Sequence, residues 1–330
     1  MTFRIFLSGL ALVLLVCAPA IFPGYLVFQI TGVLAYAVAV IGLNLITGYT
    51  GQISLGHNAF FALGAYASAL SMVHLNLHYA VSVLVAAAVT FSVGFIAGFP
   101  AQRLKGLYLA LITLVLAVAV APLIKYFKAV TGGVSGLSID RPVPPAWTGL
   151  KQDDWVYFVV LAFAAGCFFL ARNFAAGSTN RALNAVRQAP LAASSLGLNV
   201  SRTKILIFGI GSMFAGIGGA LFNFITGFIA PDSFTLYLSV GFLAAAVVGG
   251  LGTIWGALVA GLFLQFVPSF ASDISETLGG AVYGLILILC MFFMPKGIVG
   301  SLLDRRQRAS DVTSKSSASP LQQTSQRAAS

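Results

Sequence analysis

The chain has 330 residues, of which 59% are hydrophobic and only 8% are charged, and its formal net charge is +10. This composition excludes a water-soluble domain and a disordered chain, and it indicates a protein that crosses a membrane several times. The positive charge does not indicate a nucleic-acid partner, because the basic residues are dispersed among hydrophobic segments, where membrane topology explains them.

The hydrophobic segments predict an all-α polytopic membrane protein with about ten transmembrane helices, eight to ten being possible. A transmembrane helix needs about 20 mainly apolar residues. In chain order the predicted spans are 5–22, 25–47, 55–75, 79–99, 106–127, 155–172, 203–225, 236–252, 254–270 and 279–295. A secretory signal peptide is the competing interpretation of the first span. An inverted five-plus-five repeat is possible, although no repeat is evident at the residue level.

The basic residues indicate that both chain termini are cytoplasmic, because cytoplasmic loops carry an excess of Lys and Arg. Only four of the 18 basic residues would then lie outside: Lys125, Lys128, Arg141 and Lys151. This orientation predicts a membrane domain over 1–303 with a cytoplasmic loop at 173–204 and an outer loop at 128–154. Residues 304–330 are rich in Ser, Gln, Arg and Ala, which predicts a disordered cytoplasmic tail.

The stretch NLITGYTGQISLGHN, over 44–58, is unusually polar for membrane depth, and three glycines interrupt its helical pattern. Uncharged polar groups beside exposed backbone can bind a zwitterion, because helix N-termini favour carboxylate and oxygen atoms favour ammonium. The substrate-pathway candidates are therefore Asn44, Thr47, Thr50, Gln52, Ser54, His57 and Asn58. A cytoplasmic turn and helix cap, with Asn44 in helix packing, is the competing interpretation.

Residues 180–204 form the long segment in the middle of the chain that a bilayer would not accept. Their first part, 181–188, predicts a short amphipathic helix. A second short helix is predicted to start near Pro190 and run through Leu196, with Gly197 as its stop. Two short helices present a rigid surface to another protein, so we interpret the segment as a docking loop. An interfacial loop whose arginines meet lipid phosphates would use the same residue types.

A second glycine-dense stretch, VGGLGTIWGALVAG, covers 248–261. It predicts a tight turn between two closely packed helices, and a broken helix that faces the pathway is the alternative. The packing or gating glycines of this stretch are Gly249, Gly250, Gly252 and Gly256.

The sequence lacks the features that are typical of several other functional classes. The phosphate-binding pattern GxxxxGK[ST] does not occur, so this chain is not expected to hydrolyse ATP by that route. The spacing of Cys and His indicates no metal site, and no cluster of nucleophile and acid suggests an enzyme. No Asp, Glu, Lys or Arg lies deep in a predicted span, which disfavours a proton-coupled carrier, although His57 keeps that class open. A sodium-coupled carrier is harder to exclude.

Six motifs in order resemble a known family. They are GLNLITGYTGQISLGHNAFFALGAYASA from Gly42, RLKGLYLALITL from Arg103 with TGGVSGL from Thr131, RALNAVRQAPLAASSLGLNVSRTK from Arg181, GFIAPDSF from Gly227, VVGGLGTIWGALVAG from Val247 and MPKGIVG from Met294. From about residue 30 to 303 the chain resembles the M-type permease subunits of bacterial branched-chain amino acid ABC importers.

The resemblance implies a non-catalytic, multi-pass subunit of the bacterial inner membrane that forms half of a translocation pathway and binds no cofactor. The implied partners are a homologous second permease, two ATP-binding subunits that use ATP and magnesium, and a periplasmic substrate-binding protein. The implied substrates are branched-chain or other hydrophobic amino acids. Urea, short amides or aromatic acids are the alternative substrates, and a stand-alone secondary carrier is the lesser alternative.

The resemblance also implies an ATPase-coupling role for the docking loop, because the importers insert a loop with an EAA-x3-G pattern into a cleft on the ATPase. Ala192, Ala193 and Gly197 hold the matching positions. Leu191 stands where the pattern has Glu, so we expect apolar docking by Leu191 and Leu196. The coupling residues are then Arg181, Val186, Arg187, Pro190, Leu191, Ala192, Ala193, Leu196 and Gly197.

Overall fold

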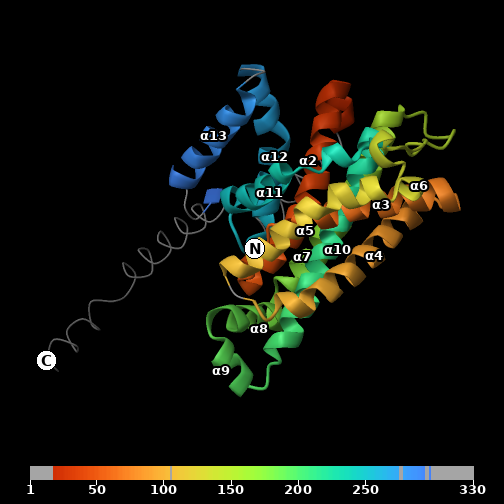
Figure 1. Ribbon diagram of the computed structural model, residues 1–330. Helices are drawn as coiled ribbons and strands as arrows, with labels where there is room; N and C mark the ends of the chain where they lie inside the picture. Colours follow the sequence, from red (N-terminus) through yellow and green to blue (C-terminus); the bar gives the residue numbers. More distant parts are fainter. Residues whose placement is uncertain (1–17, 105, 275–277, 294–296, 299–330) are drawn as a thin grey trace, which may run out of the picture.

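The computed structural model describes residues 18–104, 106–274, 278–293 and 297–298, which are almost entirely helical (Figure 1). The elements are α2 (Gly24–Leu43), the π-helix η1 (Asn44–Tyr49), α3 (His57–Leu75), α4 (Tyr79–Ala101), α5 (Leu107–Tyr126), α6 (Lys128–Thr131), the 3-10 helix η2 (Gly133–Ser135), β1 (Leu137–Ser138), α7 (Gln152–Phe174), α8 (Gly177–Gln188), α9 (Pro190–Ser195), α10 (Val200–Thr226), β2 (Phe228–Ile229), the 3-10 helix η3 (Pro231–Ser233), α11 (Leu236–Gly249), α12 (Ile254–Ile274) and α13 (Gly279–Phe293).

Eight helices in this described part are long and apolar enough to cross a membrane. One of them, Gly24–Tyr49, joins α2 and η1, and another, Pro231–Gly249, joins η3 and α11. A shorter apolar helix covers Gly279–Cys290. The predicted class of polytopic helical membrane protein is therefore confirmed. The predicted span 5–22 falls largely outside the described residues, and the predicted tail 304–330 falls wholly outside them.

Helix α10 lies inside the bundle, where it packs against α2, α3 and α4 (Figure 1). Glycines make these contacts possible. A Cβ added to Gly42 would lie 2.1 Å from the carbonyl oxygen of Gly211, and a Cβ added to Gly64 would lie 2.2 Å from the Cα of Gly216. Small residues at helix contacts let backbones approach closely, which favours association where lipid replaces water.

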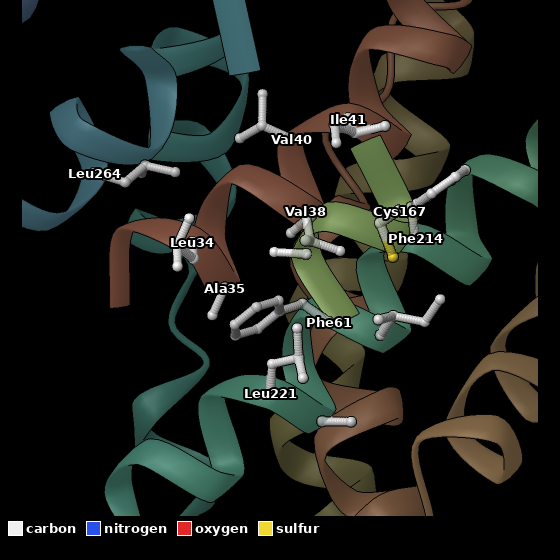
Figure 2. Close-up of a cluster of buried hydrophobic side chains, with 14 of the residues drawn as sticks. Leu34, Ala35, Val38, Val40, Ile41, Phe61, Cys167, Phe214, Leu221 and Leu264 are labelled. Carbon is white, nitrogen blue, oxygen red and sulfur yellow. The ribbon is translucent and has the colours of Figure 1, made fainter. Parts of the chain in front are cut away.

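Large apolar side chains fill the space between these close backbone contacts (Figure 2). Val38 from α2, Phe61 from α3 and Phe214 from α10 are fully buried in one cluster. Cys167 from α7 belongs to the same cluster as a free thiol, which packs there as a small apolar residue. Helices distant in the sequence thus share one core.

We expect Gly219→Val to disrupt the contact between α10 and α3. A Cβ at this position would already lie 1.9 Å from the carbonyl oxygen of Phe61, so the two backbones would have to separate. Overpacking a core costs about 1–3 kcal/mol and sometimes more, which predicts a lower midpoint of thermal unfolding for the purified protein in detergent. The matched control is Gly166→Val, because a Cβ at Gly166 has no neighbour within 4 Å. Equal losses in both variants would contradict this account.

The predicted outer loop, 128–154, is folded against the connection between α10 and α11. β1 pairs with β2 in antiparallel register, Leu137 opposite Ile229. This two-residue pair is a local departure from the all-α class that we predicted. Arg141 Nη2 lies 2.7 Å from Asp153 Oδ1, which joins the loop to the start of α7. The loop and the pair α8–α9 lie at opposite ends of the bundle (Figure 1). We call these two ends the loop end and the α8–α9 end.

Candidate functional site

The polar stretch 44–58 has three conformations in succession. η1 continues α2 as a π-helix, residues 51–56 then leave helical geometry, and α3 begins at His57. All seven polar candidates are buried, from 0% exposed for Asn58 to 6% for Thr47. π-helical turns inside membrane or soluble helices occur often at functional sites. Non-helical backbone at membrane depth is tolerated where protein encloses it or where it lines a cavity.

Side chains satisfy much of this irregular backbone. Thr47 Oγ1 donates to the carbonyl oxygen of Gln52 at 3.1 Å, and Thr50 Oγ1 donates to that of Ile46 at 2.6 Å. The amide of Leu55 donates to Thr113 Oγ1 on α5 at 2.9 Å. Buried backbone groups need such partners, so the threonines stabilise the departure from helix.

Helix α3 begins inside the bundle and not at its end. His57 Nε2 lies 2.7 Å from the carbonyl oxygen of Ala39 in α2. Ala39 precedes Gly48 by nine residues, which is about 13 Å along a helix at 1.5 Å per residue. The chain therefore runs back along α2 before α3 starts.

The N-terminus of α11 lies beside that of α3. Asn58 Nδ2 donates to the carbonyl oxygen of Thr235 at 2.9 Å, and Thr235 is the N-cap of α11. One turn further, Ser239 Oγ donates to the carbonyl oxygen of Leu55. Helix N-termini carry partial positive charge, so two such ends meet within the bundle.

Unpaired acceptors gather in the same stretch. Among the described residues, eight buried side-chain polar atoms have no hydrogen-bond partner. Four of the eight belong to the polar stretch: Asn44 Oδ1, Gln52 Oε1, His57 Nδ1 and Asn58 Oδ1. Because His57 Nε2 faces a carbonyl oxygen, it donates, which leaves Nδ1 as an acceptor in the neutral ring. Each unsatisfied buried polar group costs about 1–3 kcal/mol, so the stretch is suited to a ligand that donates hydrogen bonds.

The docking loop forms the two short helices that the sequence predicted. α8 buries Leu183 and Val186 against the bundle, each 2% exposed, and keeps Arg181 exposed. Pro190 occupies the first position of α9, and Ala193 is the buried residue of that helix. The predicted helix over 181–188 is therefore amphipathic in the structure, with its apolar side chains against the protein.

Gly197 ends α9 with left-handed backbone, at φ +85°. The amide of Gly197 donates to the carbonyl oxygen of Ser194 at 3.0 Å, and the amide of Leu198 donates to that of Ala193 at 3.1 Å. This pair of bonds is a Schellman cap, which favours glycine at the left-handed position. Two leucines of this region, one at the start of α9 and one directly before Gly197, project outward.

Leu191 and Leu196 are 84% and 82% exposed. They lie next to Ala192, which is also exposed. The two leucines thus give the helix pair α8–α9 a small exposed apolar surface.

One side chain of the docking loop contacts the polar stretch. Arg187 Nη1 donates to the carbonyl oxygen of Gly48 in η1. A Cβ added to Gly51 would lie 3.3 Å from Arg187 Cγ, and a Cβ added to Gly252 would lie 4.0 Å from Nη1. Arg187 therefore lies where η1, the segment after it and the turn after α11 come together.

The glycines at the end of α11 form a close contact with α12. A Cβ added to Gly249 would lie 2.1 Å from the carbonyl oxygen of Gly256. Gly250 and Gly252 have φ values of +112° and +78° in the connecting turn. Asn44 Nδ2 donates to the carbonyl oxygen of Thr253 in that turn at 3.1 Å. This geometry agrees with the predicted tight turn, and it also places the turn against η1.

Sequence reasoning missed Thr113, Thr235 and Ser239, which complete the surroundings of the polar stretch. Thr113 and Ser239 are isolated hydroxyls in predicted apolar spans, and such residues carry no pattern of their own. Thr235 directly precedes the predicted span 236–252, where a threonine is typical of a helix N-cap. Within the described ranges, no group of three or more His, Cys, Asp or Glu residues is arranged to hold a metal ion.

A family model described as the permease component of branched-chain amino acid transport systems matches residues 25–291. The chain is 31% identical over 319 residues to the high-affinity branched-chain amino acid transport system permease protein LivM of Escherichia coli K12, covering 90% of this chain and 75% of LivM. It is 26% identical to LivH of Salmonella typhimurium and to BraD of Pseudomonas aeruginosa, permease proteins of the same transport system type, over 80% of this chain and 91% of each relative. No solved structure matches significantly. The chain therefore belongs to the family of permease components of branched-chain amino acid transport systems.

Proposed function

We propose that this chain is a multi-pass inner-membrane permease subunit of an ATP-driven importer for branched-chain or other hydrophobic amino acids. One observation carries the proposal beyond family membership: Arg187 connects the exposed helix pair α8–α9 to the buried polar stretch. A subunit that transmits motion from an ATPase to a pathway needs such a connection. The similarity to both LivM and LivH proteins supports a second, homologous permease as the other half of the pathway.

The remaining partners follow from this division of work. Two ATP-binding subunits, which use ATP and magnesium, dock on α9 at the α8–α9 end, and this end is cytoplasmic. A periplasmic substrate-binding protein docks at the loop end, on 128–154. The chain itself binds no cofactor and catalyses no reaction, and the lipid bilayer surrounds it. No nucleic acid takes part.

In this mechanism the ATPase binds Leu191 and Leu196 and moves α8 and α9 as one rigid body. Arg187 transmits the motion to the carbonyl of Gly48, which belongs to a π-helix and not to a regular α-helix. π-helical turns are rare and occur frequently at functional sites, so η1 is the place where we expect the rearrangement. Movement there shifts residues 51–56 and the N-terminus of α3, which opens the pathway on one side.

The polar stretch recognises the substrate's charged groups. The N-termini of α3 and α11 favour its carboxylate. The unpaired acceptors on Gln52, His57 and Asn58 favour its ammonium group. Urea and short amides are a second substrate class, because their N–H groups would also satisfy these acceptors. Aromatic acids would use the helix N-termini alone.

We expect Gln52→Leu to slow ATP-driven leucine uptake by about tenfold or more, because a hydrogen bond to a charged group contributes about 1.5–3 kcal/mol. The assay uses proteoliposomes that contain the complete transporter. Assembly with the ATP-binding subunits should remain unchanged, since Gln52 is 4% exposed and lies away from the surface of α9.

The matched control is Gln102→Leu. Gln102 Oε1 is likewise buried without a partner, but it lies outside the polar stretch. Unchanged uptake kinetics in Gln52→Leu, or an equal loss of uptake rate in both variants, would contradict substrate binding by the polar stretch and would indicate that it serves helix packing.

A further inference from the structure

A cavity of about 250 Å³ lies between α11 and the segment that precedes α3. The residues that line it are Val240, Leu243, Ala244 and Val247 from α11, Leu251 from the turn after α11, Leu287 from α13, and Thr47 and Ile53 from the polar stretch. Ile53 and Val240 are 40% and 44% exposed, so the cavity has an open side. Apart from Thr47, its lining side chains are aliphatic.

The position of the cavity ties it to the polar stretch. Thr47 donates its hydroxyl hydrogen to the carbonyl oxygen of Gln52, whose side-chain Oε1 is one of the unpaired acceptors. Ile53 follows Gln52 directly. The apolar cavity and one unpaired acceptor, Gln52 Oε1, thus share one segment of backbone, residues 47–53, and the other unpaired acceptors of the polar stretch flank that segment. A molecule with an apolar end and a hydrogen-bond-donating end fits this combination.

Its size restricts the ligand. Apolar cavities of about 150 Å³ can hold a benzene-sized group, and pockets for drug-sized ligands span about 300–1,000 Å³. A volume of about 250 Å³ therefore accommodates the branched side chain of a small amino acid. It also accommodates a benzyl group. Ala244, whose side chain is 4% exposed, lies on the cavity wall, so the size of the residue at this position limits how large a side chain can enter.

We propose that this cavity receives the aliphatic side chain of the transported amino acid, and that Val240, Ala244 and Ile53 set its permitted size. The inference rests on the proposed function and adds to it a side-chain subsite on α11. The side chain lies along α11 while the ammonium group bonds the acceptors of the polar stretch. Closure of the subsite accompanies movement of η1, because Thr47 belongs to both.

Cysteine labelling tests the assignment independently of transport. In the complete transporter, with Cys17, Cys167 and Cys290 replaced by alanine, Val240→Cys is treated with a hydrophilic maleimide. We expect labelling, because the subsite opens to an aqueous pathway, and we expect saturating leucine to slow it about tenfold or more while glycine does not. The matched control is Val118→Cys on α5, whose side chain is 50% exposed and faces lipid in our account; it should not react.

Two outcomes would overturn the subsite. Unreactive Val240→Cys would mean that a lipid chain or the second permease covers the cavity, and labelling without protection by leucine would mean a water path with no bound side chain. Either result in a complex that still imports leucine with ATP leaves the proposed function standing. Absence of ATP-driven import by the complete transporter with its natural cysteines would instead count against the function.

Transport by size variants gives a second reading. Ala244→Leu fills the cavity and should lower uptake of leucine relative to alanine by about tenfold or more, since one methylene in an apolar site is worth about 10–200-fold. Ala244→Gly enlarges it and should shift preference toward phenylalanine. Val118→Leu adds the same kind of bulk on α5 and should change neither ratio. Ratios that stay constant in both Ala244 variants would contradict the proposal.

Discussion

Replacing Leu191 and Leu196 together by aspartate is expected to abolish ATP-driven uptake while the chain still inserts and folds. Both side chains are more than four-fifths exposed, so their loss removes little internal packing. Burying a leucine contributes about 1.5–3 kcal/mol, so losing two weakens docking about a hundredfold or more. An unpaired carboxylate in an apolar cleft adds a desolvation cost. The measurement is the amount of ATP-binding subunit that co-purifies with the tagged chain, together with uptake in proteoliposomes.

The matched control for this double variant is Leu191→Met with Leu196→Met, which keeps apolar volume and should retain both docking and uptake. If the aspartate variant retained a normal amount of ATP-binding subunit on co-purification, the assignment of α9 as the docking helix would be wrong. An interfacial loop held by lipid phosphates predicts the reverse order of sensitivity: loss of Arg181 and Arg187 would matter, and loss of the leucines would not.

Arg187→Ala should uncouple the transporter without disassembling it. The variant removes a charge-assisted hydrogen bond to Gly48, worth about 1.5–3 kcal/mol, and so should lower the amount of leucine imported per ATP hydrolysed by about tenfold or more. Leu191 and Leu196 remain in place, so the ATP-binding subunits should still co-purify and hydrolyse ATP.

Arg202→Ala is the control for Arg187→Ala. Arg202 is an exposed arginine at the start of α10, so this substitution removes the same charge from the same end of the bundle. It should keep the ratio of transport to hydrolysis. If Arg187→Ala also keeps that ratio, the contact with Gly48 carries no coupling, and the connection between α8 and η1 is only a packing contact.

The features predicted correctly from the sequence are those that local chemistry determines. The amphipathic pattern of 181–188, the proline that begins α9 and the glycine at 197 each act within a few residues, and the structure has both helices and the cap where they indicate. The tight turn in the glycine-dense stretch 248–261 could be predicted for the same reason, because glycines that are close in the sequence lie at one helix contact.

The features that remained hidden depend on contacts between distant residues. Arg187 and Gly48 are 139 positions apart, and nothing in the spacing of either motif indicates their bond. The span predicted over 55–75 ends where α3 ends and starts two residues before it, but no periodicity reveals that His57 lies beside Ala39, inside the bundle. Thr235 and Asn58 likewise meet only after folding. The site is therefore a product of packing, whereas its parts are visible in the sequence.

The most direct test of whether this chain is a subunit of an ATP-driven importer is co-purification. The tagged chain is purified from native membranes in mild detergent, and mass spectrometry identifies the proteins bound to it. Our account predicts a complex that contains a second, homologous permease and two ATP-binding subunits. A chain that emerges alone, and that transports leucine in liposomes on an ion gradient without ATP, would contradict it and would identify a stand-alone secondary carrier.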